Sequence, residues 1–202
     1  MAAARGEWGL LPRPLVLASR SPQRRAILEQ LGVPFEARPT DVDELSAGDP
    51  RVVALENARR KAAAATEAAR PGLAAAAAGH VHVLAVDTVV ALDGRIYDKP
   101  ADEAAARAGL GALAGRTHEV IGGLVLDDRA TIAVTKVTFR ALDDALLDWY
   151  LATGEWRDRA GGYAIQGRGA ALVHGIEGDY LNVVGLPLAA LLDVMESSAF
   201  PP

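Results

Sequence analysis

The sequence lacks several features that would each assign the protein to a class. It has no cysteine, which excludes disulfides and thiolate chemistry and fits the cytosol. No apolar run reaches the ~18 residues of a membrane span, and the first residues lack the apolar core of a signal peptide. Positive charge is scarce too, because the net charge is −5 and the isoelectric point is near 5.4. We therefore expect a cytoplasmic protein without a membrane or nucleic-acid partner.

Familiar catalytic motifs are also missing. The chain has no H-E-x-x-H zinc motif and no G-x-S-x-G serine motif. A glycine-rich stretch, residues 154–169, has neither the G-K-[ST] ending of a phosphate loop nor a dinucleotide fingerprint, although its backbone N–H groups remain available to a ligand. Half of the 202 residues are hydrophobic, which is enough for a sizeable core. We assign residues 14–196 to one domain, residues 1–13 to an N-terminal extension and residues 197–202 to a C-terminal tail.

The most informative stretch lies near the start, where residues 16–28 read VLASRSPQRRAIL. The apolar residues 15–17 predict a short buried strand. Ser21 followed by proline predicts a helix start, because serine is a favoured N-cap and proline fits the first helical position. Hydroxyls of Ser19 and Ser21 and the guanidinium of Arg24 then meet free backbone N–H groups, which favours binding of an anion, especially phosphate. The alternative is a capped helix with solvated arginines.

The strongest predicted strand covers residues 80–92, which read HVHVLAVDTVVAL. It is apolar on both faces, as expected for a central strand. One charge, Asp87, interrupts it. A lone carboxylate in such a strand is costly unless it is paired, bound to metal or placed at the exposed end. Asp87 is therefore interpreted as a working carboxylate, the alternative being a satisfied structural aspartate.

The rest of the chain alternates between predicted helices and strands. We expect a strand over residues 33–38, an acidic loop over 40–44 and a helix from 49–50 to about Ala69, which Pro71–Gly72 breaks. Residues 74–78 form an alanine tract that we interpret as a loop. Further on we expect a turn at 93–94, a helix at 103–113, paired strands at 117–126 and 131–140, a helix at 142–151, a strand at 171–176, a loop at 179–187 and a helix at 188–195.

These elements carry side chains that together suit a polyphosphate. Cations and a metal would neutralise the phosphates, and one carboxylate would take a proton from water. Within the acidic loop, Asp43 and Glu44 suit a divalent cation, the alternative being an ordinary solvated loop. The inventory consists of the basic residues Arg24, Lys61 and Lys99, the hydroxyl residues Ser19, Ser21 and Thr88, and the acidic residues Asp43, Glu44 and Asp87.

Ordered blocks over nearly the whole chain resemble the Maf family of nucleotide pyrophosphatases. The blocks are LASRSPQRRAILEQLGVPFE, VDE (42–44), ENARRKA (56–62), AVDTVVALDGRIYDKP (85–100), GRTHEV (115–120) and RAGGYAIQGRGAALVHGIEGDYLNVVGLPL (159–188). The resemblance implies an α/β fold, with a twisted mixed sheet flanked by helices in two lobes around a cleft, similar to the inosine-triphosphate pyrophosphatases. It also implies a hydrolase that converts nucleoside triphosphates to the monophosphate and pyrophosphate and so clears non-standard nucleotides.

By motif position, the resemblance assigns roles to individual residues. Asp87 would be the general base that activates water, and Asp43 and Asp87 would hold a divalent metal, Mg²⁺ or Mn²⁺. The resemblance further implies a homodimer. The residues that would hold the triphosphate are Ser19, Ser21, Arg24, Lys61 and Lys99.

Three positions bear on the choice of base. Family members that act on dTTP and UTP typically have threonine after the motif aspartate and glutamine in the GYxIQ block, and Thr88 and Gln166 match. Gln23 stands where those members have arginine, so this position stays open. The chain also has Gly122–Gly123 where a Thr-Gly pair is usual. We expect a preference for dTTP and UTP.

Three other functions remain as alternatives. The first is a pyrophosphatase of the type that acts on methylated GTP, whose members carry different residues at the three positions. The second is a regulator of septum formation and division that acts through protein contacts. The third is a phosphate-binding module without turnover.

Overall fold

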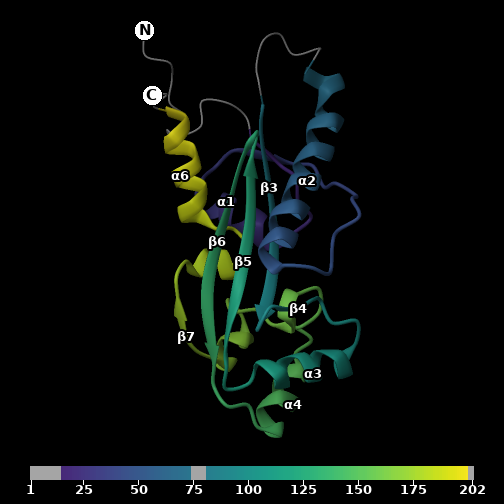
Figure 1. Ribbon diagram of the computed structural model, residues 1–202, viewed down its shortest axis with the longest axis vertical. Coiled ribbons are helices and arrows are strands. Elements are labelled where there is room, and N and C mark those ends of the chain that lie inside the picture. Colours follow the sequence, from purple (N-terminus) through teal and green to yellow (C-terminus); the bar gives the residue numbers. More distant parts are fainter. Residues whose placement is uncertain (1–14, 74–80, 200–202) are drawn as a thin grey trace.

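The computed structural model of the protein describes residues 15–73 and 81–199 (Figure 1). The predicted extension, the alanine tract at 74–78 and the last three residues of the chain lie outside these ranges. Within them, no helix combines the length and the apolar character that a membrane crossing needs.

A mixed sheet runs through the molecule and confirms the predicted α/β fold class. In the described ranges its seven strands follow the order β2-β1-β3-β5-β6-β7, with β4 paired to β3 beside that path. β1 is parallel to β2 and β3, whereas the other pairs are antiparallel. The strands are β1 (Leu15–Leu17), β2 (Phe35–Ala37), β3 (His82–Leu92), β4 (Arg95–Tyr97), β5 (Thr117–Leu126), β6 (Arg129–Phe139) and β7 (Val173–Glu177).

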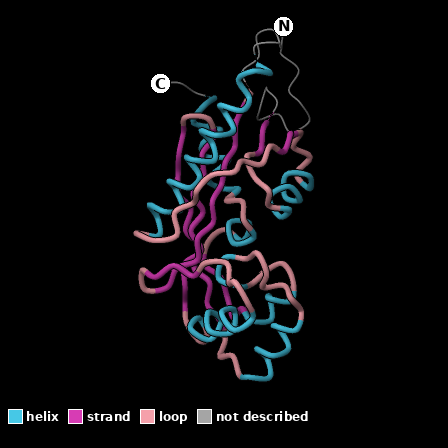
Figure 2. Tube along the Cα trace, turned by 90° about the vertical axis from the view of Figure 1, so that its right-hand side faces the viewer, coloured by secondary structure: helices cyan, strands magenta, loops and turns pink. Residues whose placement is uncertain are grey.

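Helices surround the two ends of this sheet. α1, α2 and α6 lie along its upper half and α3 and α4 at its lower end (Figures 1 and 2). The helices are α1 (Pro22–Gln30), α2 (Pro50–Leu73), α3 (Glu103–Leu113), α4 (Asp144–Ala152), α5 (Tyr180–Val184) and α6 (Leu188–Ala199), with 3₁₀ turns η1 (Ala160–Gly162) and η2 (Arg168–Leu172).

The core of the described residues consists of four apolar clusters, and two of them fill the two lobes. One apolar cluster includes Leu110 of α3 and Tyr150 of α4, and another includes Leu28 of α1 and Leu191 of α6. β3 and β5 contribute to both clusters, so these long strands pass from one lobe to the other. Asp87 lies near the middle of β3, between the β3 residues that enter the two cores.

Local sequence signals account for several elements. Ser21 is the N-cap of α1, and its side chain accepts a hydrogen bond from the Arg24 N–H. Asp102 caps α3 in the same way. Asp93 and Gly94 both have positive φ and form the two-residue turn between β3 and β4, as the Asp-Gly pair predicts.

Other elements differ from the prediction. α2 continues through Pro71–Gly72 to Leu73, so the proline does not end the helix, and it removes a single backbone donor close to the C-terminus. The segment predicted as a loop contains α5, which the side chain of Asp179 caps by accepting the Leu181 N–H. α6 extends to Ala199, three residues into the predicted tail.

Two glycines in β5 let other elements approach the middle of the sheet. Gly123 is the register partner of Asp87, and a Cβ on it would overlap the backbone of Ala54 in α2. Gly122 lies opposite Thr88, and a Cβ there would overlap the side-chain oxygen of Asn182. A threonine at position 122 would clash with Asn182, which accounts for the glycine found there. The close approach of α2 brings its polar residues to Asp87.

Candidate active site

The carboxylate of Asp87 is buried and held by two donors from α2. Asp87 is 7% exposed. Oδ1 accepts a hydrogen bond from Lys61 Nζ at 2.6 Å, and Oδ2 accepts one from Asn57 Nδ2 at 3.1 Å. The two donors are four residues apart and therefore project from the same face of the helix. Pairing with an ammonium and an amide offsets the cost of burying the charge, as expected for a carboxylate in an apolar strand.

The ammonium of Lys61 joins Asp87 to the loop before α2. Lys61 Nζ lies 2.8 Å from Glu44 Oε1 as well as 2.6 Å from Asp87. The side chain of Lys61 is 11% exposed, whereas that of Glu44 is 44% exposed. One buried cation thus bridges two carboxylates, and Glu44 is the one that opens to solvent.

The buried asparagine of this group was absent from the predicted site residues. Asn57 is 2% exposed and contacts Leu45, the residue after Glu44, as well as Asp87. A signal for it does exist in the sequence. It is a polar residue within the apolar stripe of a helix, one turn before Lys61, where a buried amide requires hydrogen-bond partners.

A second hydrogen-bonded group surrounds Arg24, which is 8% exposed. Its guanidinium donates to Ser19 Oγ at 2.9 Å, to Thr88 Oγ1 at 3.0 Å and to the Gly185 carbonyl at 2.8 Å. Burial lowers the pKa of Arg24, and attraction by the carboxylates of Asp87 and Glu44 acts in the opposite direction. Arginine stays charged in proteins, so the group keeps a fixed cation close to Asp87.

The hydroxyls predicted to hold phosphate belong to this second group. Ser19 Oγ accepts the Ser21 N–H at 3.1 Å, and Ser21 Oγ donates to Gln23 Oε1 at 3.1 Å. Thr88 follows Asp87 directly in β3, so their side chains leave opposite faces of the strand. The structure joins Ser19, Ser21, Gln23, Arg24 and Thr88 in one hydrogen-bonded group and Lys61 and Asp87 in another, and the two are linked by the attraction of the Asp87 and Glu44 carboxylates on Arg24.

Lys99 belongs to the other lobe of the molecule. It is exposed, follows β4 and lines a hollow of about 530 Å³ between β4, α3 and η1. Burial raises the pKa of the neighbouring Asp98, the charges of Asp87 and Glu44 raise it further, and Lys99 lowers it. Asp98, the neighbour of Lys99 in the chain, therefore lies within the electrostatic field of the buried carboxylate.

Two predicted residues lie outside these hydrogen-bonded groups. Gln166 is exposed and follows η1. Asp43 is exposed too, and its backbone carbonyl accepts a hydrogen bond from Arg60 at 2.8 Å. In the described part of the chain, the neighbouring Glu44, rather than Asp43, shares Lys61 with Asp87.

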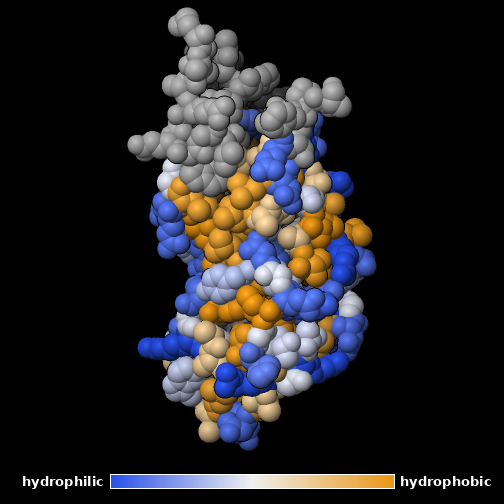
Figure 3. Space-filling model, turned by 90° about the vertical axis from the view of Figure 1, so that its left-hand side faces the viewer, coloured by the Kyte–Doolittle hydropathy of each residue, from blue (hydrophilic) through white to orange (hydrophobic). Residues whose placement is uncertain are grey.

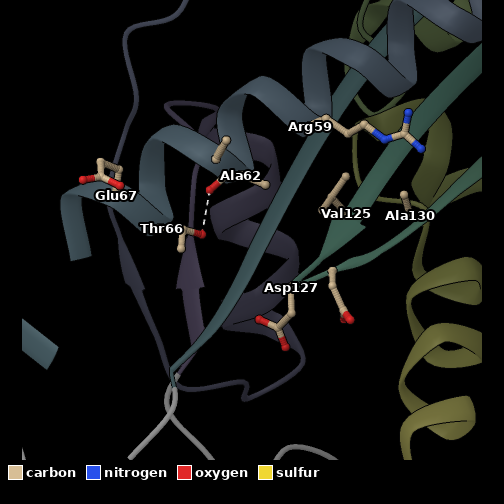
Figure 4. Close-up of a pocket in the computed structure, with 9 residues that line it drawn as sticks. Arg59, Ala62, Thr66, Glu67, Val125, Asp127 and Ala130 are labelled. Carbon is tan, nitrogen blue, oxygen red and sulfur yellow. Dashed lines mark hydrogen bonds between the residues drawn. The ribbon is translucent and has the colours of Figure 1, made fainter. Parts of the chain in front are cut away.

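A separate hollow of about 400 Å³ lies over α2 and the turn between β5 and β6 (Figure 4). Its floor is apolar, and the hydroxyl of Thr66 is turned back to the Ala62 carbonyl. Asp127 and Asp128 at its edge would repel a polyphosphate. The lining contains none of the predicted site residues; it consists of Arg59, Ala62, Ala63, Thr66, Glu67, Val125, Asp127, Asp128 and Ala130. The polyphosphate site is therefore expected at Asp87.

The family model described as Maf-like protein matches residues 14–198. The chain belongs to the Maf family. Among its relatives is a protein from Anaeromyxobacter dehalogenans named dTTP/UTP pyrophosphatase, 43% identical over 95% of this chain and 97% of its own. Proteins of the same name from Pyrococcus furiosus and Moorella thermoacetica are 42% and 44% identical, over 91% and 90% of this chain and 95% and 93% of their own.

A divalent metal in this Maf protein would depend on few protein ligands. Within residues 15–73 and 81–199, no three histidine or acidic side chains gather closely enough to hold a metal ion. Mg²⁺ does not require such a cage, because it keeps several waters and binds through one or two carboxylates together with substrate phosphates. The hard oxygens of Asp87 and Glu44, which meet at one ammonium, fit an ion that arrives with a triphosphate.

Proposed function

We propose that this Maf protein hydrolyses nucleoside triphosphates to the monophosphate and pyrophosphate, with a preference for dTTP and UTP. The observation that carries the proposal is the buried carboxylate of Asp87, held between Lys61 and Asn57 and next to the Thr88–Arg24 contact. The names of relatives that align over more than 90% of their length support the same activity. Removal of non-standard or surplus nucleotides would be its role.

In the proposed mechanism Asp87 takes the proton of the attacking water. Each carboxylate oxygen has two lone pairs, and Lys61 and Asn57 use one on each, which leaves a lone pair on each oxygen to accept a hydrogen bond from water. The water oxygen bonds to the α-phosphorus as the bond from that phosphorus to the bridging oxygen breaks, and pyrophosphate leaves. Arg24, Lys61 and Lys99 stabilise the charge on the phosphates, together with the hydroxyls of Ser19 and Ser21.

We assign the metal to Asp43 and Asp87, with Glu44 as a further oxygen ligand. Mg²⁺ or Mn²⁺ bound there would supply positive charge against the triphosphate. Asp43 precedes Glu44 directly and is open to solvent, so its carboxylate is accessible to an ion bound to the substrate.

The preference for dTTP and UTP is supported by two residues, Thr88 in the Arg24 group and Gln166 outside it. Thr88 Oγ1 already accepts from Arg24, so its own hydroxyl hydrogen remains free to donate to a substrate. Gln166 is exposed and offers both a donor and an acceptor. Gln23 carries no charge and is bonded to Ser21, so it contributes a polar contact where an arginine would add a cation.

The test is a substrate panel on the purified protein. We expect pyrophosphate release with Mg²⁺ or Mn²⁺, fastest with dTTP and UTP, and loss of release when EDTA removes the metal. Absence of pyrophosphate from every nucleotide would overturn the proposal and leave the division regulator. Thermal stabilisation by nucleotides without product would instead indicate a phosphate-binding module, and a maximum with methylated GTP would indicate the other substrate class.

We also propose that the protein is a cytoplasmic homodimer. Val134 of β6 and Ile176 of β7 are large apolar residues that remain exposed, at 37% and 40%. Figure 3, which shows the side of β7 and α6, displays hydrophobic patches between hydrophilic ones. Contact with a second copy would remove such surface from water. Light scattering should give twice the chain mass of 21.1 kDa, and a mass of one chain would contradict the dimer.

A further inference from the structure

We infer that Asn57 is a positioning residue that orients the carboxylate of Asp87 and ties it to the acidic loop. The inference rests on the proposed function, in which Asp87 takes a proton from water. Asn57 is 2% exposed and lies in α2, one turn before Lys61. Its side chain is therefore shielded from substrate and acts through the residues that it contacts.

The direction of the Asn57 amide is fixed by the backbone of Leu45. Asn57 Oδ1 accepts the Leu45 N–H at 2.7 Å, and Nδ2 donates to the Leu45 carbonyl at 3.0 Å. Rotation of the amide by half a turn would place its NH₂ against that N–H and its oxygen against both the carbonyl and Asp87. The remaining N–H must therefore point at Asp87 Oδ2, 3.1 Å away.

Two donors on opposite oxygens keep the carboxylate plane of Asp87 from turning. Lys61 holds Oδ1 at 2.6 Å and Asn57 holds Oδ2 at 3.1 Å, each from the same helix face. Loss of Asn57 would leave a single contact about which the carboxylate can swing. A misplacement of ~1 Å in a reacting group can cost ~100-fold in rate, so this restraint matters for proton transfer.

The same amide also places the second carboxylate of the site. Leu45 follows Glu44 directly, so fixing both polar groups of the Leu45 backbone holds the end of the loop against α2. The Glu44 carboxylate then reaches Lys61 Nζ at 2.8 Å. One buried side chain thus sets the relative positions of Asp87, Lys61 and Glu44.

Two substitutions separate these contacts. Asn57→Asp is nearly isosteric and keeps the acceptor for the Leu45 N–H, but it turns a second carboxylate toward Asp87. Asn57→Leu removes every hydrogen bond while suiting the apolar stripe of Val53 and Ala54. Val53→Ala is the matched control, because Val53 is also 2% exposed and lies one turn away on the same helix.

The readouts are kcat and KM for dTTP, with the melting temperature of each variant. We expect kcat to fall by about 100-fold in Asn57→Asp and at least about tenfold in Asn57→Leu, with KM within about threefold of wild type. Val53→Ala should lower the melting temperature but leave kcat unchanged.

Wild-type kcat in both Asn57 variants, or an equal loss of kcat in Val53→Ala, would overturn the inference and show a merely structural asparagine. If the wild type itself releases no pyrophosphate, the proposed function fails and the inference fails with it. An active wild type with active Asn57 variants overturns the inference alone.

Discussion

Replacement of Asp87 by asparagine tests the proposed chemistry most directly. Both oxygens of Asp87 face donors, Lys61 Nζ at 2.6 Å and Asn57 Nδ2 at 3.1 Å. An amide has one oxygen and one NH₂ group, so in either orientation its NH₂ meets another donor. The favoured orientation keeps the oxygen on Lys61 and loses the Asn57 contact. The negative charge of the site falls by one in either case.

The expected loss of stability depends on the ion pair that Lys61 retains after the substitution. Removal of one partner from a buried ion pair typically costs ~3–5 kcal/mol, because a charge is left uncompensated. In this protein Lys61 retains Glu44 at 2.8 Å, so its charge is not stranded. We therefore expect the free energy of unfolding to fall by about 1.5–3 kcal/mol, the range for a lost hydrogen bond to a charged group.

The effect on activity should be far larger than the effect on folding. Loss of the proton acceptor should reduce kcat by about 10²–10⁴-fold. Binding of dTTP measured without the divalent metal should be unchanged or tighter, because a negative charge near the phosphates is gone. Pyrophosphate release, equilibrium binding of dTTP and thermal unfolding of Asp87→Asn measure the three quantities separately.

Asp127→Asn provides a matched control. The Asp127 carboxylate also accepts two hydrogen bonds, from the His82 ring and the Val83 N–H, but lies outside the site. We expect it to affect stability and not kcat. Turnover of Asp87→Asn within about tenfold of wild type would refute the general-base assignment. Loss of nucleotide binding together with folding would identify Asp87 as a structural residue.

Three further predictions concern packing, pH and base choice. Gly123→Ala places a methyl group against the backbone of Ala54, so the free energy of unfolding should fall by about 3 kcal/mol or more, and the melting temperature should fall with it. The control Gly111→Ala, whose new methyl group meets no atom within 4 Å, should be neutral or stabilising. Equal melting temperatures would contradict the tight contact. Burial lowers the pKa of His118 from 6.5 to about 4. Between these pH values His118 is protonated in the unfolded chain but not in the folded chain, so the free energy of unfolding should fall by about 3 kcal/mol from pH 6.5 to pH 4. His118→Gln should flatten this dependence, and an unchanged slope in denaturant titrations would exclude His118 as its source. Gln23→Arg should raise selectivity for dTTP and UTP; an unchanged substrate profile would show that position 23 has no part in base choice.

Much of the fold could be predicted because its signals are local. The Ser21 cap, the Asp102 cap and the Asp93–Gly94 turn each depend on a few neighbouring residues, and all three form as expected. α5 was missed because its five residues carry too little periodicity to distinguish a helix from a loop. Its cap, Asp179, was present in the sequence but gave no indication of how far the helix extends.

The candidate site was predictable in its residue types but not in its contacts. A lone aspartate in an apolar strand must find partners, so Asp87 stood out from the sequence alone. Which partners it finds was not visible, because Asn57 and Lys61 reach it only where Gly123 admits the α2 backbone to the sheet. The sequence offers both Asp43 and Glu44 as acidic residues of the loop, and the loop geometry brings Glu44 to the Lys61 ammonium.

By itself the sequence determined where the chain turns, which strand is central and which charged side chains have no local reason to be buried. These properties depend on periodicity and capping, which act over a few residues. Only the tertiary structure decided that Arg24 meets the Gly185 carbonyl, 161 residues further along, and that Lys61 is shared by two carboxylates. Such contacts form when packing of the apolar clusters brings distant segments together, and no local pattern in the chain encodes that distance.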